Sequence, residues 1–372
     1  MAAPPSDPEK RGAFGLITHL TLSNVGPAPG MELDFGSRLN LLTGDNGLGK
    51  NFLLDTIWWP MTRSWPAEVP PLAAGRAALP ADKKKPASIV SCFSEDSGST
   101  DIESSFNARM QKWTVRKGRP ADPGLVLYAM ADGCFAVWDP ARHYRKSRRE
   151  ETALRPAACV FRPSEVWNGL QNREGAWLCS GLIRDWAIWQ MQNGRAFDAL
   201  KSVLDVLSPS EEEKPVPGKL TRISLADARD MPTLRMPYGQ DASSGMRRII
   251  SLAYLLVWCR SEHLKATELL GEDAEHRAVL PVDEAGAHLH PRWQRTVLPA
   301  LLNVMGVLSA GMQFQIIAAT HSPLIMASAE TLFDGKKDAW FDLEITDGKV
   351  TLTKRPFIRM GNVTNWLTSK TW

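Results

Sequence analysis

The sequence predicts an α/β fold, and three observations support this prediction. An apolar run, Leu39–Leu42, leads into a glycine-rich loop and then into a helical pattern. Strand-like and helical patterns alternate between residues 278 and 324, which is typical of a sheet covered by helices. Short segments between residues 88 and 140 are rich in β-forming residues and are separated by Gly, Asp and Ser. A mixed sheet and a second, antiparallel region are therefore expected.

Strands and helices can be placed along most of the chain. Residues 14–36 alternate as two antiparallel strands with a turn over residues 26–30. Residues 164–206 have a helical pattern in which Trp167, Trp177, Trp186 and Trp189 form a packing stripe, and a Pro/Glu-rich linker follows at 208–218. The first helix is expected to stop at Pro60. Further strands are expected at 89–93, 113–115, 125–130, 134–138, 278–282 and 314–319, and a helix at 292–308.

Composition excludes several classes of protein. The chain has 372 residues and a formal net charge of +3, so it carries no global signal for binding a polyanion. Five cysteines, an odd number without metal-like spacing, indicate free thiols in a reducing compartment. The longest apolar stretch, residues 249–259, is too short to span a bilayer, and the first residues lack the apolar core of a signal peptide. A cytoplasmic location is therefore expected.

The glycine-rich loop carries the strongest functional signal. Residues 44–50 fit the pattern G-x-x-x-x-G-K, in which backbone N–H groups and a helix N-terminus hold phosphate oxygens. The residues expected to bind nucleotide here are Asn46, Gly47, Gly49, Lys50, Asn51 and Phe52. Asn51 stands where Ser or Thr usually ligates Mg²⁺; its amide oxygen is also a hard ligand, so metal binding is weakened rather than excluded. The alternative is a Gly-rich turn without a ligand.

A second group of polar residues follows two later strands. The run Val279–Glu284 ends in two carboxylates, as in a Walker B motif: Asp283 is placed to hold Mg²⁺ and Glu284 to act as general base. His321 ends the next strand and could contact the γ-phosphate or the attacking water; the alternative is a strand-end histidine bonded to a carbonyl. His288 and His290 form a poor zinc site, since no cysteine or acid triad lies nearby.

These motifs resemble those of the ATP-binding-cassette ATPases of the RecF, chromosome-maintenance and overcoming-lysogenization-defect type. More narrowly, the chain is similar to bacterial AAA-type ATP-binding proteins found in phage-defence operons. The matching strings lie at residues 42–50, 241–248, 282–291 and 319–324. The resemblance implies a P-loop ABC-ATPase head with a mixed central sheet, an antiparallel β subdomain and an inserted helical lobe. It divides the chain into a flexible tail (1–13), a P-loop lobe with the antiparallel region (14–160), a helical insertion and linker (161–235) and a signature, Walker B and switch-histidine lobe (236–372).

The resemblance also implies a mechanism. Two heads pair head to tail, with ATP and Mg²⁺ held between the P-loop of one and the signature loop of the other, here Ser243, Ser244 and Gly245. Read without the family, this loop is only a helix N-cap. ATP would close the homodimer or a higher oligomer, hydrolysis would reopen it, and the cycle would drive an effector protein such as a nuclease or toxin.

The chain departs from the family pattern at several positions, which leaves two other functions open. Asn51 replaces Ser/Thr, the signature reads Ala-Ser-Ser-Gly-Met, Gly286 stands where many relatives have an acid, and no Q-loop glutamine is identified. No heptad arm and no acid-rich Toprim domain are expected. One alternative is a non-hydrolysing, nucleotide-locked scaffold. The other is a DNA-repair ATPase that binds duplex through the basic run 142–149, whereas Lys83, Lys84 and Lys85 are expected to be a solvated surface.

Overall fold

The fold is described from a computed structural model of the chain. The residues that the structure describes are 14–69, 77–95, 98–115, 122–143, 158–172, 174–221, 234–235, 242–308, 311–361 and 365–366. The predicted tail, residues 1–13, and residues 144–149 of the basic run lie outside them.

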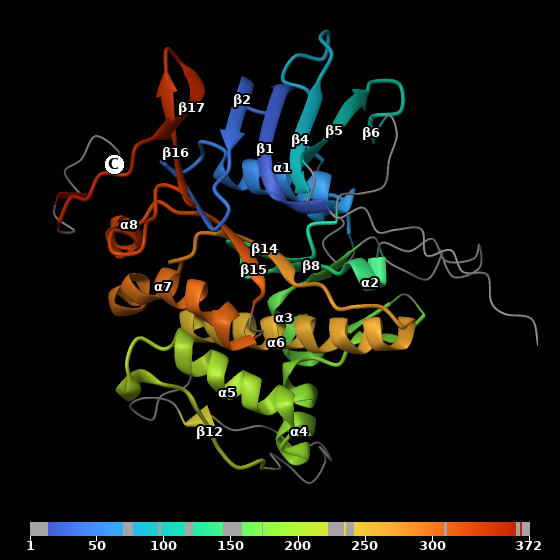
Figure 1. Ribbon diagram of the computed structural model, residues 1–372, viewed down its shortest axis with the longest axis vertical. Helices are drawn as coiled ribbons and strands as arrows, with labels where there is room; N and C mark the ends of the chain where they lie inside the picture. The colour runs from blue at the N-terminus through green and yellow to red at the C-terminus, as the bar shows by residue number, and fades with distance from the viewer. Residues whose placement is uncertain are drawn as a thin grey trace, which may run out of the picture.

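A mixed eight-stranded sheet crosses the middle of the molecule (Figure 1). Five neighbouring strands, β16, β3, β15, β14 and β7, run parallel, and antiparallel strands extend the sheet at both edges. In spatial order the strands are β17 (Lys349–Arg355), β16 (Ala339–Thr346), β3 (Leu39–Gly44), β15 (Gln313–Ala319), β14 (Arg277–Asp283), β7 (Leu125–Ala129), β8 (Phe135–Trp138) and β9 (Cys159–Phe161). Because parallel strands end at the same edge of a sheet, β3, β14 and β15 bring the residues that follow them together.

The central strands are apolar because both of their faces are covered. Every residue of β3 is buried, as is β14 after its first residue, as expected for parallel strands between two layers. Pro281 lies inside β14, opposite Ile317 of β15, although proline removes a backbone donor and is rare in interior strands. The register with β7 passes through Ala278, Val279 and Val282 and leaves Pro281 out.

A second sheet is antiparallel and lies above the first in Figure 1. Its strands, in spatial order, are β2 (Ala28–Asp34), β1 (Phe14–Val25), β4 (Ser88–Glu95), β5 (Gly98–Asn107) and β6 (Lys112–Val115). The two predicted N-terminal strands are confirmed, but the hairpin turns at residues 26–27 rather than over 26–30. Strand β5 was not predicted, because its Ser, Thr, Asp and Glu residues give little apolar signal.

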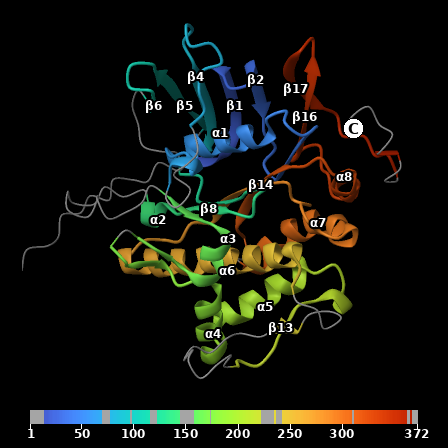
Figure 2. The same ribbon diagram turned by 180° about the vertical axis from the view of Figure 1, so that it is seen from behind.

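Helices cover both faces of the central sheet. Helix α1 (Lys50–Thr62) lies between the two sheets, and α6 (Ser244–Leu270), α7 (Pro291–Leu308) and α5 (Arg195–Leu207) lie on the opposite side (Figures 1 and 2). The remaining helices are short: α2 (Pro140–His143), α3 (Pro163–Asn168), α4 (Leu182–Gln192), α8 (Pro323–Ala329) and the 3₁₀ turns η1 (Pro66–Glu68) and η2 (Glu211–Glu213). The α/β architecture with a mixed sheet, an antiparallel sheet and a helical lobe is confirmed.

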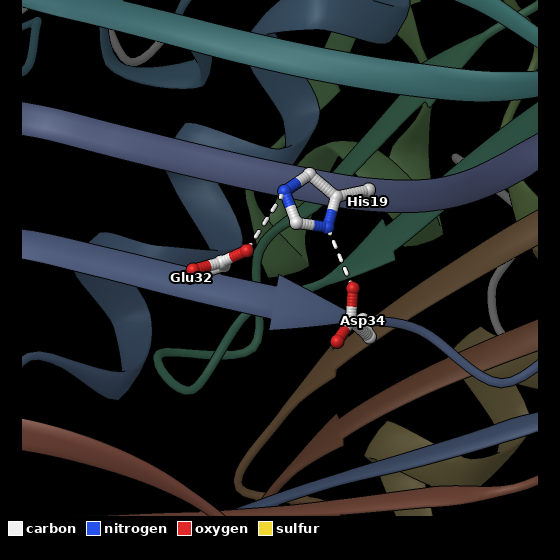
Figure 3. A group of neighbouring side chains, drawn as sticks. All are labelled: His19, Glu32 and Asp34. Atoms are coloured by element: carbon white, nitrogen blue, oxygen red, sulfur yellow. Dashed lines mark hydrogen bonds and ion pairs between the residues drawn. The ribbon is translucent and has the colours of Figure 1, made fainter.

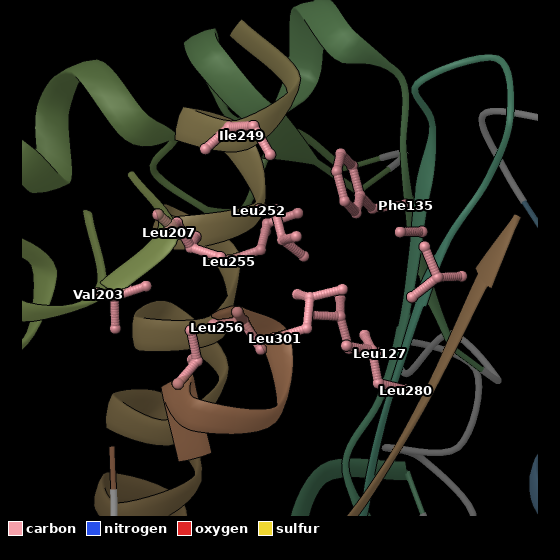
Figure 4. Close-up of a cluster of buried hydrophobic side chains, with 14 of the residues drawn as sticks. Leu127, Phe135, Val203, Leu207, Ile249, Leu252, Leu255, Leu256, Leu280 and Leu301 are labelled. Atoms are coloured by element: carbon pink, nitrogen blue, oxygen red, sulfur yellow. The ribbon is translucent and has the colours of Figure 1, made fainter. Parts of the chain in front are cut away.

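Two apolar cores result from this layering. One lies between α1, the antiparallel sheet and one face of the central sheet, and contains the fully buried Trp58 and Phe341. The other joins the opposite face to α5, α6 and α7 (Figure 4). There, Leu127 and Leu280 of the sheet face Leu252 and Leu255 of α6. The long α6 is thereby fixed against this face of the central sheet.

Two predictions about helices were wrong. Helix α1 does not stop at Pro60 but continues to Thr62; the Arg63 N–H bonds the Trp59 carbonyl at 2.8 Å, and the buried Trp58 and Trp59 hold the last turn in the core. One missing hydrogen bond near a helix end costs less than exposing these rings.

The second was the helical pattern over 164–206, which α3, α4 and α5 follow but which is interrupted between α3 and α4. A small hairpin, β10 (Leu170–Gln171) with β11 (Trp177–Cys179), separates α3 from α4. Gly169, Gly175 and Gly181 have positive φ and make this excursion possible. Trp177 is 48% exposed and lies against Arg184, so it does not belong to the packing stripe.

Candidate functional site

The P-loop connects β3 to α1 through backbone conformations that favour glycine. Gly44, Gly47 and Gly49 have φ of 135°, 85° and 96°. A Cβ on Gly44 would lie 2.5 Å from the Leu343 carbonyl oxygen, so this position cannot carry a side chain. Asn46 and Gly47 are exposed at the tip, and nothing lies within 4 Å of a Cβ built on Gly47. Since the first-turn N–H groups of α1 lack intrahelical partners, this loop fits a phosphate.

Lys50 is buried inside this loop. Its side chain donates to the Gly44 carbonyl at 2.7 Å and to the Asp45 carbonyl at 3.1 Å. Its Nζ also lies 3.7 Å from Oε1 of Glu284. The P-loop lysine and the last residue of the Walker B run are therefore brought together across 234 residues of sequence, as the order of the strands requires.

Glu284 and His321 form a direct pair. His321 Nδ1 lies 2.7 Å from Glu284 Oε2, so the histidine contacts a carboxylate and not the carbonyl of the alternative interpretation. Glu284 has φ of 51°, an uncommon value for a residue other than Gly, Asn or Asp, and this conformation follows directly after the end of β14. The carboxylate is mostly buried, whereas the imidazole is half-exposed. A base next to solvent, oriented by a second group, is the arrangement that activates a water molecule.

Asp283 is buried at the end of β14. Burial, and then the neighbouring charge of Glu284, raise the pKa of its carboxyl to about 6, while Lys50 and Arg248 act in the opposite direction. A buried carboxylate beside a second acid is stabilised by a cation, which suits a position in the Mg²⁺ shell.

Asn51 and Phe52 open helix α1. Asn51 is exposed, and its Oδ1 accepts the Phe52 N–H at 2.9 Å. The Phe52 ring lies against Gly26, so the hairpin between β1 and β2 abuts the P-loop. By donor chemistry, the amide oxygen of Asn51 and the Asp283 carboxylate fit Mg²⁺, which would be held by these two residues and would neutralise phosphate charge.

The signature residues begin helix α6. Ser243 is the N-cap, and its Oγ accepts the Met246 N–H at 3.3 Å. Ser243 and Ser244 are exposed, whereas Gly245 is buried; a Cβ on Gly245 would lie 2.4 Å from the His288 carbonyl oxygen. Among the described residues, no hydrogen bond or ion pair joins these three residues to the P-loop of the same chain.

Three residues near the site were not predicted from the sequence. The largely buried Arg248 donates from Nη2 to the Asp283 carbonyl at 2.6 Å and from Nη1 to the Ala131 carbonyl at 3.4 Å, and burial lowers its pKa. Burial raises the pKa of Asp55 to about 7, while the hydrogen bond with Tyr128 acts in the opposite direction and the charge of Asp283 adds to the rise. Asp132 follows β7, the parallel neighbour of β14. Only the strand order, which the sequence does not reveal, brings these groups together.

A separate polar group lies on the antiparallel sheet (Figure 3). His19 of β1 contacts Asp34 through Nδ1 at 2.7 Å, and its Nε2 lies 3.6 Å from Glu32 and 2.7 Å from Thr21. The two carboxylates face different nitrogens of the ring, so the group is a cross-strand hydrogen-bonded cluster. It includes none of the predicted site residues; His288 and His290, also outside this cluster, are exposed.

Part of the chain matches a known protein family. The model of the family described as "AAA domain, putative AbiEii toxin, Type IV TA system" matches residues 138–327, slightly more than half of the chain. The chain belongs to this AAA-domain family. The matched region contains the signature, the Walker B run and His321, and the P-loop lies before it.

The AAA-domain chain is also similar to a curated anti-phage relative, a Septu protein, over part of its length. It is 33% identical over 131 residues to the Septu protein PtuA of Bacillus mycoides (strain KBAB4). The aligned part covers 35% of this chain and 16% of that protein.

Several solved structures are similar at low identity. They include the SMC head domain of Thermotoga maritima (13% identity, TM-score 0.44, 92% of this chain and 99% of that chain) and the recombination mediator RecF with ATP (14%, 0.42, 94% and 100%). A third is the Smc head domain with an extended coiled coil from Pyrococcus furiosus, bound to the C-terminal domain of ScpA (12%, 0.48, 91% and 96%). Within the described part of the chain, no helix has the length and apolar character needed to cross a membrane.

Proposed function

We propose that the chain is an ATPase head that binds ATP at the P-loop, dimerises on it, and controls an effector protein in bacterial defence against phage. The observation that carries the catalytic part is the convergence of Lys50, Glu284 and His321 at one edge of the sheet. The defence role is supported by membership of the AAA-domain family and by the similarity to a Septu protein.

The chain's own residues have distinct roles in this proposal. Lys50 and the N–H groups at the start of α1 bind the phosphates of ATP. Glu284 accepts a proton from the attacking water, and His321, in contact with its Oε2, orients the carboxylate and meets the γ-phosphate. Asp283 and Asn51 hold Mg²⁺. Ser243, Ser244 and Gly245 contact the nucleotide of a second subunit, in keeping with the lack of a hydrogen bond or ion pair, among the described residues, to the P-loop of their own chain.

The non-hydrolysing scaffold is a second candidate, and the contact made by Asn51 favours it. Because its Oδ1 accepts the Phe52 N–H, this oxygen must leave a backbone partner to reach a metal. Steady-state release of phosphate by the wild type, Asn51→Ser and Glu284→Gln separates the two functions. An ATPase loses turnover by about 10²–10⁴ in Glu284→Gln and gains turnover in Asn51→Ser. A wild type that retains ATP but releases no more phosphate than Glu284→Gln is a scaffold.

Dimerisation has its own measurement. Light scattering with ATP and Mg²⁺ should show a dimer for Glu284→Gln, in which hydrolysis is blocked, and a monomer for the same variant carrying Ser244→Arg. Ser244 is exposed, so the added arginine can be accommodated in the monomer while blocking a partner's nucleotide. A dimer that persists with Ser244→Arg would contradict the role assigned to the signature loop.

DNA binding through the basic run has less support. Arg142, the first residue of that run, is ion-paired with Glu262 and lies over the Trp258 ring. Its guanidinium therefore already has partners within the chain. Residues 144–149 lie outside the described residues. A DNA affinity that is insensitive to salt would argue against this candidate.

A further inference from the structure

A cavity of about 530 Å³ lies beside the signature helix and away from the P-loop. One wall is a single face of α6, formed by Ser244, Arg248 and Ser251 at helical spacing. The facing wall is α3, with Ser164 and Trp167. Trp167 Nε1 donates to Ser251 Oγ at 3.1 Å and ties the two walls together. The cavity is thus bounded by ordered helices, and its volume falls in the range of small-molecule sites.

The lining of the cavity combines apolar and cationic side chains. Its apolar part consists of the Trp167 indole, Pro163 and Ile183. A flat ring can stack against an indole.

The cationic part of the lining is formed by Arg247 and Arg248. Arg247 is exposed at the first turn of α6, where its Nε donates to the Ala242 carbonyl; within the described residues no carboxylate forms an ion pair with it. Arg248 donates to two carbonyls, and a guanidinium has five N–H donors. The one acid in the lining, Asp132, already accepts the Cys134 N–H at 2.9 Å. Two arginines against one carboxylate leave this part of the lining net positive, which favours an anionic group on the ligand.

We propose that this cavity binds a ligand of the class of a nucleoside monophosphate, with its planar ring against Trp167 and its anionic group on Arg247. The site is distinct from the P-loop, since none of its lining residues belongs to residues 44–52. It is linked to the Walker B run through Arg248, which lines the cavity and holds the Asp283 carbonyl. It also reaches the predicted dimer face through Ser244. The proposal does not depend on ATP hydrolysis at the P-loop.

Calorimetric titration of the full chain with AMP and with GMP tests this site. At least one of them should bind the wild type, and Lys50→Ala should bind it with the same affinity because the P-loop is not involved. Arg247→Ala, a change at an exposed residue, should weaken binding about ten-fold through loss of a charge-assisted hydrogen bond. Ser164→Trp fills the cavity from an exposed position on α3 and should abolish binding. Lys84→Ala, on the exposed lysine cluster, is the matched control for loss of one positive charge.

Three results would overturn the proposal. The first is the absence of binding heat for both mononucleotides when each reaches about 1 mM, a concentration at which a formed site should be occupied. The second is loss of binding in Lys50→Ala, which would place the ligand at the P-loop. The third is unchanged binding in both Arg247→Ala and Ser164→Trp, provided that circular dichroism shows folded variants.

Discussion

Replacing Asp283 by asparagine should stabilise the protein at neutral and alkaline pH. The fold raises the pKa of this buried carboxyl from 3.8 to about 6, so the ionised group costs the native state about 3 kcal/mol relative to a neutral one. Asparagine has nearly the same shape and no charge. The gain should be obtained in buffer with a chelator, where no added cation compensates the carboxylate.

The pH dependence gives the prediction its sign. An acid whose pKa is higher in the folded state binds more protons when folded, so its contribution to stability is lost as the pH rises from about 4 to 6. The advantage of Asp283→Asn should therefore be near its full value, about 3 kcal/mol, at about pH 8, and about half of that at about pH 5. Urea denaturation followed by tryptophan fluorescence at both pH values measures the difference.

The control is Asp347→Asn, because Asp347 is exposed in the turn between β16 and β17. Its free energy of unfolding should change by less than about 0.5 kcal/mol at either pH. If Asp283→Asn is less stable than the wild type at about pH 8, or if its advantage does not change with pH, the buried carboxylate is not a source of instability. With ATP and Mg²⁺ the order should reverse, since only the wild type offers the metal a carboxylate.

Two further substitutions test packing near the site. Gly245→Ala places a Cβ 2.4 Å from the His288 carbonyl oxygen and should lower the free energy of unfolding by about 1–3 kcal/mol. Its control is Gly306→Ala, at an exposed and uncrowded position of α7, which should raise the free energy of unfolding by about 0.5–1 kcal/mol. Equal melting temperatures of the two variants would contradict the crowding at Gly245. His263→Ala should cost about 3 kcal/mol, because the buried ring contacts Asp139 at 2.8 Å and accepts the Glu275 N–H at 2.8 Å. A urea midpoint close to that of the wild type would show that these groups find other partners.

The parts of the site that could be predicted from sequence are those whose signal is local. The P-loop, the run ending in Glu284 and the strand before His321 each combine a mostly apolar strand with polar residues at or directly after its end. Such strands must be buried between layers, and their ends must meet at one edge of a parallel sheet.

The parts that could not be predicted depend on contacts distant in sequence. Arg248 is useful because the Asp283 and Ala131 carbonyls, 35 and 117 residues away, lie within its reach. Strand β5 is polar and is held by pairing with β4 and β6 rather than by its own burial pattern. Because proline lacks a backbone donor, Pro60 is expected to end the helix. Burial of the tryptophans before it outweighs this local effect, and the helix continues to Thr62.

The position of Lys50 has a consequence for the timing of catalysis. A single ammonium group lies close both to the carbonyls of its own loop and to Glu284. When a phosphate binds this ammonium group, the ammonium exchanges the loop carbonyls for phosphate oxygens as its acceptors. Glu284 then loses a stabilising positive neighbour. In the proposed ATPase, Glu284 is therefore released from this ion pair only when a phosphate binds Lys50. A nucleotide too short to reach Lys50 would leave the ion pair in place.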